Sequence, residues 1–118
     1  MQIFREFKFE AAHSLPRAPE GHKCRRLHGH SYRLFVHVEG TVDPHTGWVC
    51  DFAEIKKGVE PIIDLLDHQF LNEIPGLEQS TVENLARWLW PRLKAAVPGL
   101  ARIVLWETAT SGCEYRGE

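Results

Sequence analysis

The sequence predicts an α+β fold, an antiparallel four-stranded sheet with two helices on one face. Alternating apolar residues mark long strands near both ends of the chain, and two stretches with helical apolar spacing lie together between them. Glycine and proline cluster between these segments, as turns require. Because the strands and helices are grouped along the chain, an antiparallel sheet covered on one side is favoured.

The two longest strands come first. Residues 3–13 form a strand with one face directed to the core. That face consists of Ile3, Phe7, Phe9, Ala11 and His13, and Arg5 is its one polar exception. Residues 14–27 contain prolines and a glycine and form a loop. The second strand runs from His28 to Glu39, and its apolar face consists of His28, His30, Tyr32, Leu34, Val36 and Val38. A turn over 40–47 leads to a short return strand at 48–50, which completes a hairpin with a long tip.

Two helices and a last pair of strands follow. Asp51 is the expected N-cap of a helix that continues to Leu66. Gly58 and Pro61 are unfavourable inside it, and Pro61 is expected to kink or shorten the helix. Residues 67–79 form a connection. Ser80 and Glu83 form a capping box for a second helix, in which Pro91 is awkward; its apolar stripe is Val82, Leu85, Ala86, Leu89, Leu93 and Ala96. After Pro98-Gly99 we expect a strand over 101–108 and a short one near Tyr115.

Composition restricts the class of protein. A chain of 118 residues, 43% hydrophobic and 25% charged, is expected to fold as one domain over 1–118. The formal net charge of −2 argues against nucleic acid as a partner, and no apolar run approaches the roughly 18–20 residues of a membrane span. The charged N-terminus does not resemble a signal peptide, and three widely spaced cysteines favour a reducing, cytoplasmic compartment.

Three histidines form a candidate metal site. His28 and His30 project from one face of a strand, their Cα atoms about 6.5 Å apart. If the first two strands pair antiparallel, His13 at the end of the first lies beside the start of the second. Three histidines with an open fourth position are typical of catalytic zinc; the alternative is three separate histidines that make ordinary hydrogen bonds.

Cys24 is a candidate base. It lies four residues before His28, beside Lys23, Arg25 and Arg26, and positive neighbours favour a thiolate. A thiolate near a Lewis acid can remove a proton from carbon. The spacing equally allows Cys24 to be a fourth zinc ligand in a closed structural site.

Asp67, together with its neighbour His68, and Glu107 are also candidates for the functional site. Asp67 and His68, directly after the first helix, form either an acid–base pair or a helix C-cap with a surface aspartate. Glu107 shares a strand face with apolar residues, where a carboxylate is costly unless it is paired. It either binds a planar ligand with two N–H donors or reaches solvent at the strand end.

The other histidines and cysteines are expected to be uninvolved. We expect three histidines to be solvated and non-catalytic: His22, His37 and His45. Cys50 and Cys113 are expected to be packed or inert thiols.

Taken together, these motifs resemble the 6-pyruvoyl-tetrahydropterin synthase family. The resemblance rests on Phe9-Glu-Ala-Ala-His13, Cys24-Arg-Arg-Leu-His28-Gly-His30, Asp43-Pro-His-Thr-Gly-Trp-Val-Cys-Asp-Phe52, Leu66-Asp-His-Gln-Phe-Leu-Asn72 and Trp106-Glu-Thr108. It covers the chain from Phe7 to Tyr115, and the combination is far more specific than any one motif. The chain length and the residues of these motifs are most similar to the bacterial branch of the family, which makes 6-carboxy-5,6,7,8-tetrahydropterin for queuosine biosynthesis.

The resemblance implies a role for seven residues. His13, His28 and His30 would bind Zn²⁺; Cys24 would accept a proton, with Asp67 and His68 as its relay. Glu107 would hold the amino-pyrimidinone edge of a pterin and count with the relay. It also implies the tunnelling fold (T-fold), in which subunits form barrel-like trimers and two trimers stack into a hexamer. Cys24 would then act beside Asp67 and His68 of a neighbouring subunit.

The implied activity is that of a carbon–carbon lyase. Zinc-dependent conversion of 7,8-dihydroneopterin triphosphate would give 6-carboxy-5,6,7,8-tetrahydropterin, acetaldehyde and triphosphate, and Lys23, Arg25 and Arg26 are candidates to meet the triphosphate. One alternative is the sister activity, which stops at 6-pyruvoyl-tetrahydropterin. A second, from another class, is a non-catalytic zinc-binding module that assembles through its sheet edges.

Overall fold

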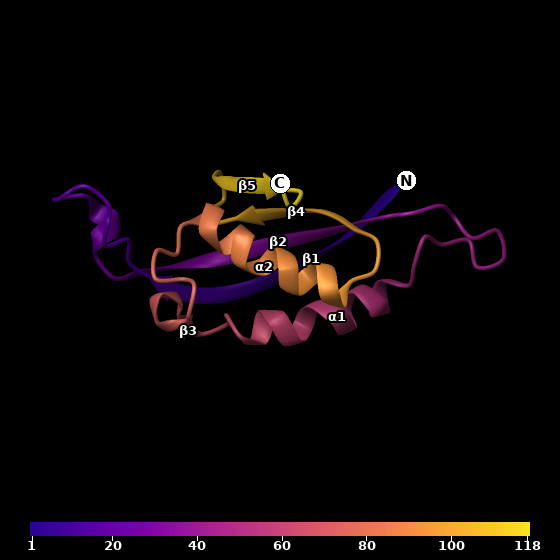
Figure 1. Cartoon of the computed structure of the whole chain (residues 1–118), viewed down its shortest axis with the longest axis horizontal. Coiled ribbons are helices and arrows are strands. Elements are labelled where there is room, and N and C mark those ends of the chain that lie inside the picture. Colours follow the sequence, from indigo (N-terminus) through magenta and orange to yellow (C-terminus); the bar gives the residue numbers. More distant parts are fainter.

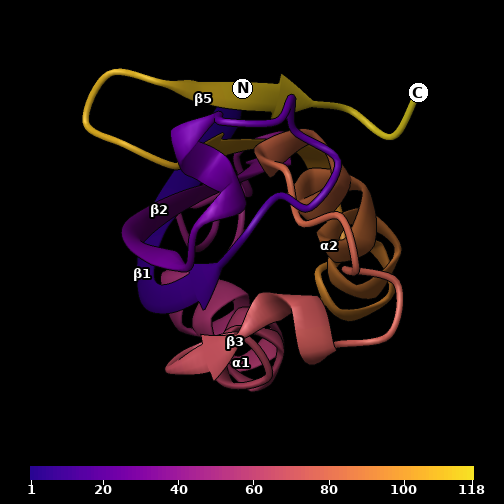
Figure 2. The same cartoon turned by 90° about the vertical axis from the view of Figure 1, so that its left-hand side faces the viewer.

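The computed structural model describes residues 1–118 as a curved sheet with two helices on one face (Figure 1). The strand order is β3-β1-β2-β4-β5. The strands are β1 (Gln2–His13), β2 (His28–Glu39), β3 (Gln69–Phe70), β4 (Leu100–Trp106) and β5 (Gly112–Tyr115), and the helices are α1 (Phe52–Asp64) and α2 (Val82–Ala96). A view along the long axis shows both helices on the same side of the sheet (Figure 2). The predicted α+β fold is therefore confirmed.

The strands β1 and β2 form the longest pair of the sheet. They are antiparallel from Gln2 opposite Glu39 to His13 opposite His28, without a register shift. Alternation along β2 buries Tyr32 and every second residue up to Val38 against the helices, as predicted. The end of β1 and the start of β2 consequently meet at one end of the sheet, where the loop 14–27 begins (Figure 1).

Two details of the predicted sheet are wrong. Residues 48–50 form bends, because both edges of β2 are already paired with β1 and β4 and a return strand has nothing to pair with. The sheet instead gains β3, which pairs parallel with Ala11 and Ala12 of β1. A two-residue strand carries no alternation, so no sequence pattern marks it.

The helix caps correct a further prediction. Asp51 caps α1 as expected, its side chain accepting from the N–H of Ala53 at 2.9 Å. The expected capping box of Ser80 and Glu83 is wrong, because Thr81 caps α2 and accepts from the N–H of Asn84 at 3.2 Å. Ser80 is fully buried and directed elsewhere.

Both helices contain their prolines. Pro61 lies inside α1 and Pro91 inside α2, so neither proline ends its helix, although α1 stops at Asp64 rather than at Leu66. Neither helix is long and apolar enough to cross a membrane.

Candidate metal centre and active-site pocket

The three predicted histidines meet where β1 ends and β2 begins. One nitrogen from each of His13, His28 and His30 lies within 4.8 Å of the other two. The ring centroids are 4.6 to 5.0 Å apart, and the rings stand steeply to one another. Register explains the cluster, because His13 lies directly opposite His28, and His30 is the next residue on the same face.

Backbone carbonyls fix the protonation of two of these rings. Nδ1 of His13 lies 2.9 Å from the carbonyl oxygen of Ser80, and Nδ1 of His28 lies 2.7 Å from that of Arg26. A carbonyl oxygen can only accept, so each Nδ1 carries the proton and each Nε2 keeps its lone pair free. Nε2 of His13 and Nε2 of His30 are buried without a hydrogen-bond partner. These free lone pairs suit a metal ion that takes imidazole ligands, as Zn²⁺ does.

Burial favours the neutral form of His13 and of His30. It lowers the pKa of His13 from 6.5 to about 4, and the neighbouring His28 and His30 act in the same direction. Burial also lowers the pKa of His30, against the opposing charge of Glu107. Neutral imidazoles are the form that binds metal, so these shifts keep the site ready at neutral pH.

We expect the metal-free protein to lose stability as the pH falls from 6.5 towards about 4, the two limits set by His13. In this window His13 is protonated in the unfolded chain but not in the folded chain. The free energy of unfolding therefore decreases as the pH decreases. Urea unfolding at several pH values measures this dependence of the free energy of unfolding on pH. His45→Ala, in an exposed loop, should keep the same dependence. A free energy of unfolding that stays flat across the window would contradict a His13 that is buried and neutral in the folded protein.

Cys24 lies in a pocket that opens onto the histidines. It is held in a short 3₁₀ turn over Lys23–Arg25, where its N–H donates to Nδ1 of His22 at 3.1 Å. The pocket has a volume of about 530 Å³ and is lined by Lys23, Cys24, Arg26, Leu27, His28, His30, Glu107, Thr108 and Ser111. Cys24 is not part of the group of ligand atoms that lie close enough to share a metal. The geometry therefore favours three histidine ligands with Cys24 beside them.

Glu107 also lines this pocket. The strand β4 ends at Trp106 rather than at Thr108 as predicted, and Glu107 begins the turn to β5, its N–H donating to the carbonyl of Ser111 at 2.9 Å. Its Oε1 lies 3.8 Å from Nε2 of His30. Since its side chain is 24% exposed, the carboxylate can meet a ligand in the pocket.

Asp67 and His68 form a pair on another surface. Oδ2 of Asp67 lies 3.0 Å from Nδ1 of His68, and Oδ1 accepts from the N–H of Glu10 at 2.9 Å. These two contacts lower the pKa of Asp67, that of the Glu10 N–H most. His68 lines a shallow hollow beside β3 that shares only His30 with the pocket of Cys24. A single chain therefore does not bring this pair into the pocket of Cys24.

The chain matches the family model described as 6-pyruvoyl tetrahydropterin synthase over residues 2–118. It belongs to the 6-pyruvoyl tetrahydropterin synthase family. A 6-carboxy-5,6,7,8-tetrahydropterin synthase of Synechocystis is 46% identical, covering 96% of this chain and 91% of the relative. A dihydroneopterin monophosphate aldolase of Pyrococcus furiosus is 36% identical, covering 96% of this chain and 95% of the relative.

The fold agrees with solved structures of this family. The 6-pyruvoyl tetrahydropterin synthase of Caenorhabditis elegans superposes with a TM-score of 0.91 at 29% identity, covering 100% of this chain and 96% of that chain. The predicted T-fold, and the prediction of an enzyme of the 6-pyruvoyl tetrahydropterin synthase family, are confirmed by these comparisons.

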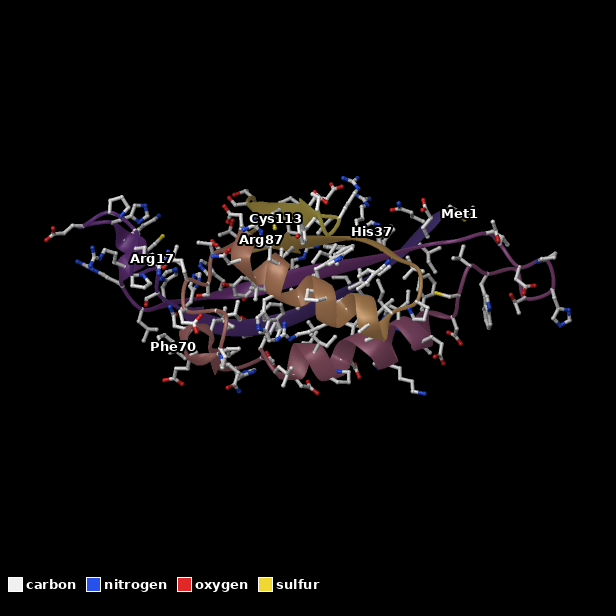
Figure 3. The ribbon with its side chains drawn as sticks, viewed as in Figure 1. Met1, Arg17, His37, Phe70, Arg87 and Cys113 are labelled. Carbon is white, nitrogen blue, oxygen red and sulfur yellow. The ribbon has the colours of Figure 1, made fainter.

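The surroundings of His37 and Ser80 differ from those expected from the sequence. His37 was predicted to be solvated but is only 7% exposed, packed against Phe4 with ring centroids 5.0 Å apart, and burial lowers its pKa. Figure 3 labels His37 on the sheet. Alternation along β2 places His37 on the face opposite that of the buried Val36 and Val38. Sequence reasoning also missed Ser80 as a partner of His13, because its position before a helix predicts a cap.

The remaining thiols behave as expected. Burial raises the pKa of Cys50 and of Cys113, so both favour the neutral form. Figure 3 labels Cys113 on β5, a strand that contacts α2.

Proposed function

We propose that this chain is a zinc enzyme that converts 7,8-dihydroneopterin triphosphate to 6-carboxy-5,6,7,8-tetrahydropterin, releasing acetaldehyde and triphosphate, in queuosine biosynthesis. The observation that carries the proposal is a three-histidine cluster that opens into a pocket walled by Cys24 and Glu107. The similarity to the Synechocystis relative of that name supports the carboxy product.

The metal ligands would be His13, His28 and His30. The unpartnered Nε2 atoms of His13 and His30 and the close spacing of the three rings support this assignment. When bound, zinc would supply Lewis acidity towards the oxygens of the substrate side chain. The other tasks belong to protein side chains.

Cys24 would accept the proton from the substrate side chain. It shares the pocket with His28 and His30, and Lys23 and Arg26 line the same pocket, where they can meet a triphosphate. The triphosphate leaves with the electron pair of its C–O bond. The bond between the first and second side-chain carbons breaks, the outer two carbons leave as acetaldehyde, and one water supplies the second oxygen of the carboxyl group. The first side-chain carbon is oxidised while the ring is reduced by two hydrogens, so the conversion needs no external reductant.

Glu107 would hold the pterin ring through its two carboxylate oxygens. We expect Glu107→Ala to weaken pterin binding roughly 10- to 100-fold, since a hydrogen bond to a charged group contributes about 1.5–3 kcal/mol. Zinc affinity should change little, because Glu107 is not among the clustered ligands. Titration with a non-reacting pterin measures the pterin affinity, and titration with zinc measures the zinc affinity. Glu118→Ala, near the C-terminus, is the control; equal pterin affinity in Glu107→Ala and wild type would contradict the role.

We also propose a hexamer of two stacked trimers in the cytoplasm. Two observations support the assembly. Most of β1 beyond its contact with β3 has a free edge, as does β5, so neighbouring subunits can pair there. The separation of Cys24 from His68 within one chain is explained if a neighbour supplies the Asp67–His68 pair. Three free thiols agree with a reducing compartment.

A mixed assembly tests the shared site. Cys24→Ala and His68→Ala proteins should each be inactive alone. Unfolded together and refolded, they should recover about a quarter of wild-type activity, because in a ring of head-to-tail contacts one site in four receives both intact residues. Activity per subunit measures the recovery. Mixing Cys24→Ala with Cys24→Arg is the matched control, and no recovery in the test mixture would contradict a site built from two subunits.

The sister activity remains the second candidate, and the likeness to the C. elegans 6-pyruvoyl tetrahydropterin synthase structure favours it. Both reactions would use the same residues. They differ in acetaldehyde release, which a coupled aldehyde dehydrogenase assay follows. Substrate turnover by zinc-loaded protein without acetaldehyde would contradict the carboxy product.

A further inference from the structure

We propose that Ser80 and Asn72 are positioning residues that hold His13 in its metal-binding orientation. Both belong to the connection between β3 and α2, remote in sequence from the three histidines. The inference rests on the proposed zinc site, and it adds that the affinity of this site depends on residues that do not touch the metal.

Ser80 contacts His13 twice. Its carbonyl oxygen lies 2.9 Å and its Oγ 3.2 Å from Nδ1 of His13, and both residues are fully buried. The carbonyl fixes the proton on Nδ1, and the hydroxyl lies where it adds a second contact to the same edge of the ring. The hydroxyl has no part in capping α2, because Thr81 does this. Its contact with His13 is the one hydrogen bond that the side chain makes.

Asn72 ties together the two segments that carry this contact. Its Oδ1 accepts from the N–H of Ser14 at 2.9 Å, and its Nδ2 donates to the carbonyls of Ser14 at 2.8 Å and of Glu78 at 3.0 Å. Ser14 directly follows His13, and Glu78 lies two residues before Ser80. A single amide therefore fixes the spacing between the end of β1 and the loop that presents Ser80.

This arrangement differs from that of His28. Nδ1 of His28 is held by the carbonyl of Arg26, two residues earlier in the chain, so its orientation is set locally. The orientation of His13 depends on a contact across 67 positions of sequence. Outer partners of metal-bound histidines typically contribute about 10- to 100-fold to metal affinity. We expect Ser80→Ala to weaken zinc binding about 10-fold and Asn72→Ala more, towards about 100-fold.

The test measures zinc affinity by competition with a chromophoric chelator on metal-stripped protein. Ser80→Ala removes one buried oxygen and leaves the carbonyl, so it should fold. Glu73→Ala is the matched control, because Glu73 is exposed in the same connection, and it should bind zinc like wild type. Ser80→Thr keeps the hydroxyl and should recover most of the affinity. The visible absorption of Co²⁺-loaded protein should shift in Ser80→Ala but not in Glu73→Ala, which reports a change in ligand geometry.

The outcomes separate this inference from the proposed function. Zinc affinities of Ser80→Ala and Asn72→Ala within twofold of wild type, with an unchanged Co²⁺ spectrum, would overturn the inference and leave the zinc site standing. Equal weakening in Ser80→Thr and Ser80→Ala would overturn the role of the hydroxyl. If Asn72→Ala does not fold, as circular dichroism shows, Ser80→Ala decides. A wild-type protein that binds no zinc would overturn both the inference and the proposed site.

Discussion

Cys24→Ala is expected to lose roughly 10²- to 10⁴-fold of turnover, the usual contribution of a general acid or base, while its zinc content stays unchanged. The reason is geometric. Cys24 lines the pocket beside His28 and His30, but it stands outside the three-nitrogen cluster. Removing it therefore removes the proton acceptor and leaves all three ligands in place. Steady-state turnover and metal analysis of the same sample measure the two effects.

The control for this variant is Cys50→Ala. Cys50 lies between the start of α1 and the end of α2, in a hollow separate from the pocket of Cys24, and burial raises the pKa of its thiol. Its replacement should leave turnover and zinc unchanged. Loss of zinc in Cys24→Ala would instead make Cys24 a fourth ligand, which is the closed site of a non-catalytic zinc-binding module.

His28→Ala is expected to reduce zinc affinity by at least roughly 100-fold, since losing a ligand costs more than losing an outer partner, and to abolish turnover. His28 is a better choice than His13 because His28 is half-buried, so its removal opens no cavity in the core, whereas His13 is fully buried. Zinc affinity is measured by chelator competition, and circular dichroism confirms the fold.

His45→Ala serves as the matched control, because His45 is exposed in the loop after β2 and should not affect zinc. Full zinc occupancy in folded His28→Ala protein would refute the three-histidine assignment. Zinc loss without loss of turnover would separate the metal from the reaction and contradict the proposed mechanism.

Periodicity was sufficient to predict the part of the fold that builds the metal cluster. The alternation along residues 3–13 and 28–39 predicts the faces of β1 and β2, and an antiparallel pair of this length brings His13 beside His28. These features are local patterns or direct consequences of pairing adjacent strands.

Features that depend on which of several segments occupies a position in the tertiary structure could not be predicted from periodicity. Residues 48–50 have strand-forming character but no free edge of β2 to pair with. Ser80 and Thr81 both suit an N-cap, and only the position of His13 decides which hydroxyl turns inward. His37 alternates onto the polar face, yet Phe4 covers it.

The motifs in the sequence suggest seven candidate site residues, but they do not predict how these residues are arranged in space. The structure places Cys24 and Glu107 in one pocket with His28 and His30, and it places His68 at another surface. No spacing along one chain reveals whether a neighbour completes a site. The roles of Asn72 and Ser80 could not be predicted either, because Asn72 contacts Ser14 and Ser80 contacts His13 across more than fifty positions of sequence.

The identity of the pterin product tests the central claim most directly. Zinc-loaded wild-type protein would be incubated with 7,8-dihydroneopterin triphosphate and the pterin read by mass spectrometry, with metal-stripped protein as the control. We expect 6-carboxy-5,6,7,8-tetrahydropterin together with acetaldehyde, formed only by the zinc-loaded protein. A 6-pyruvoyl product would contradict the carboxy assignment while keeping the site, and no pterin product from fully zinc-loaded protein would contradict the catalytic account as a whole.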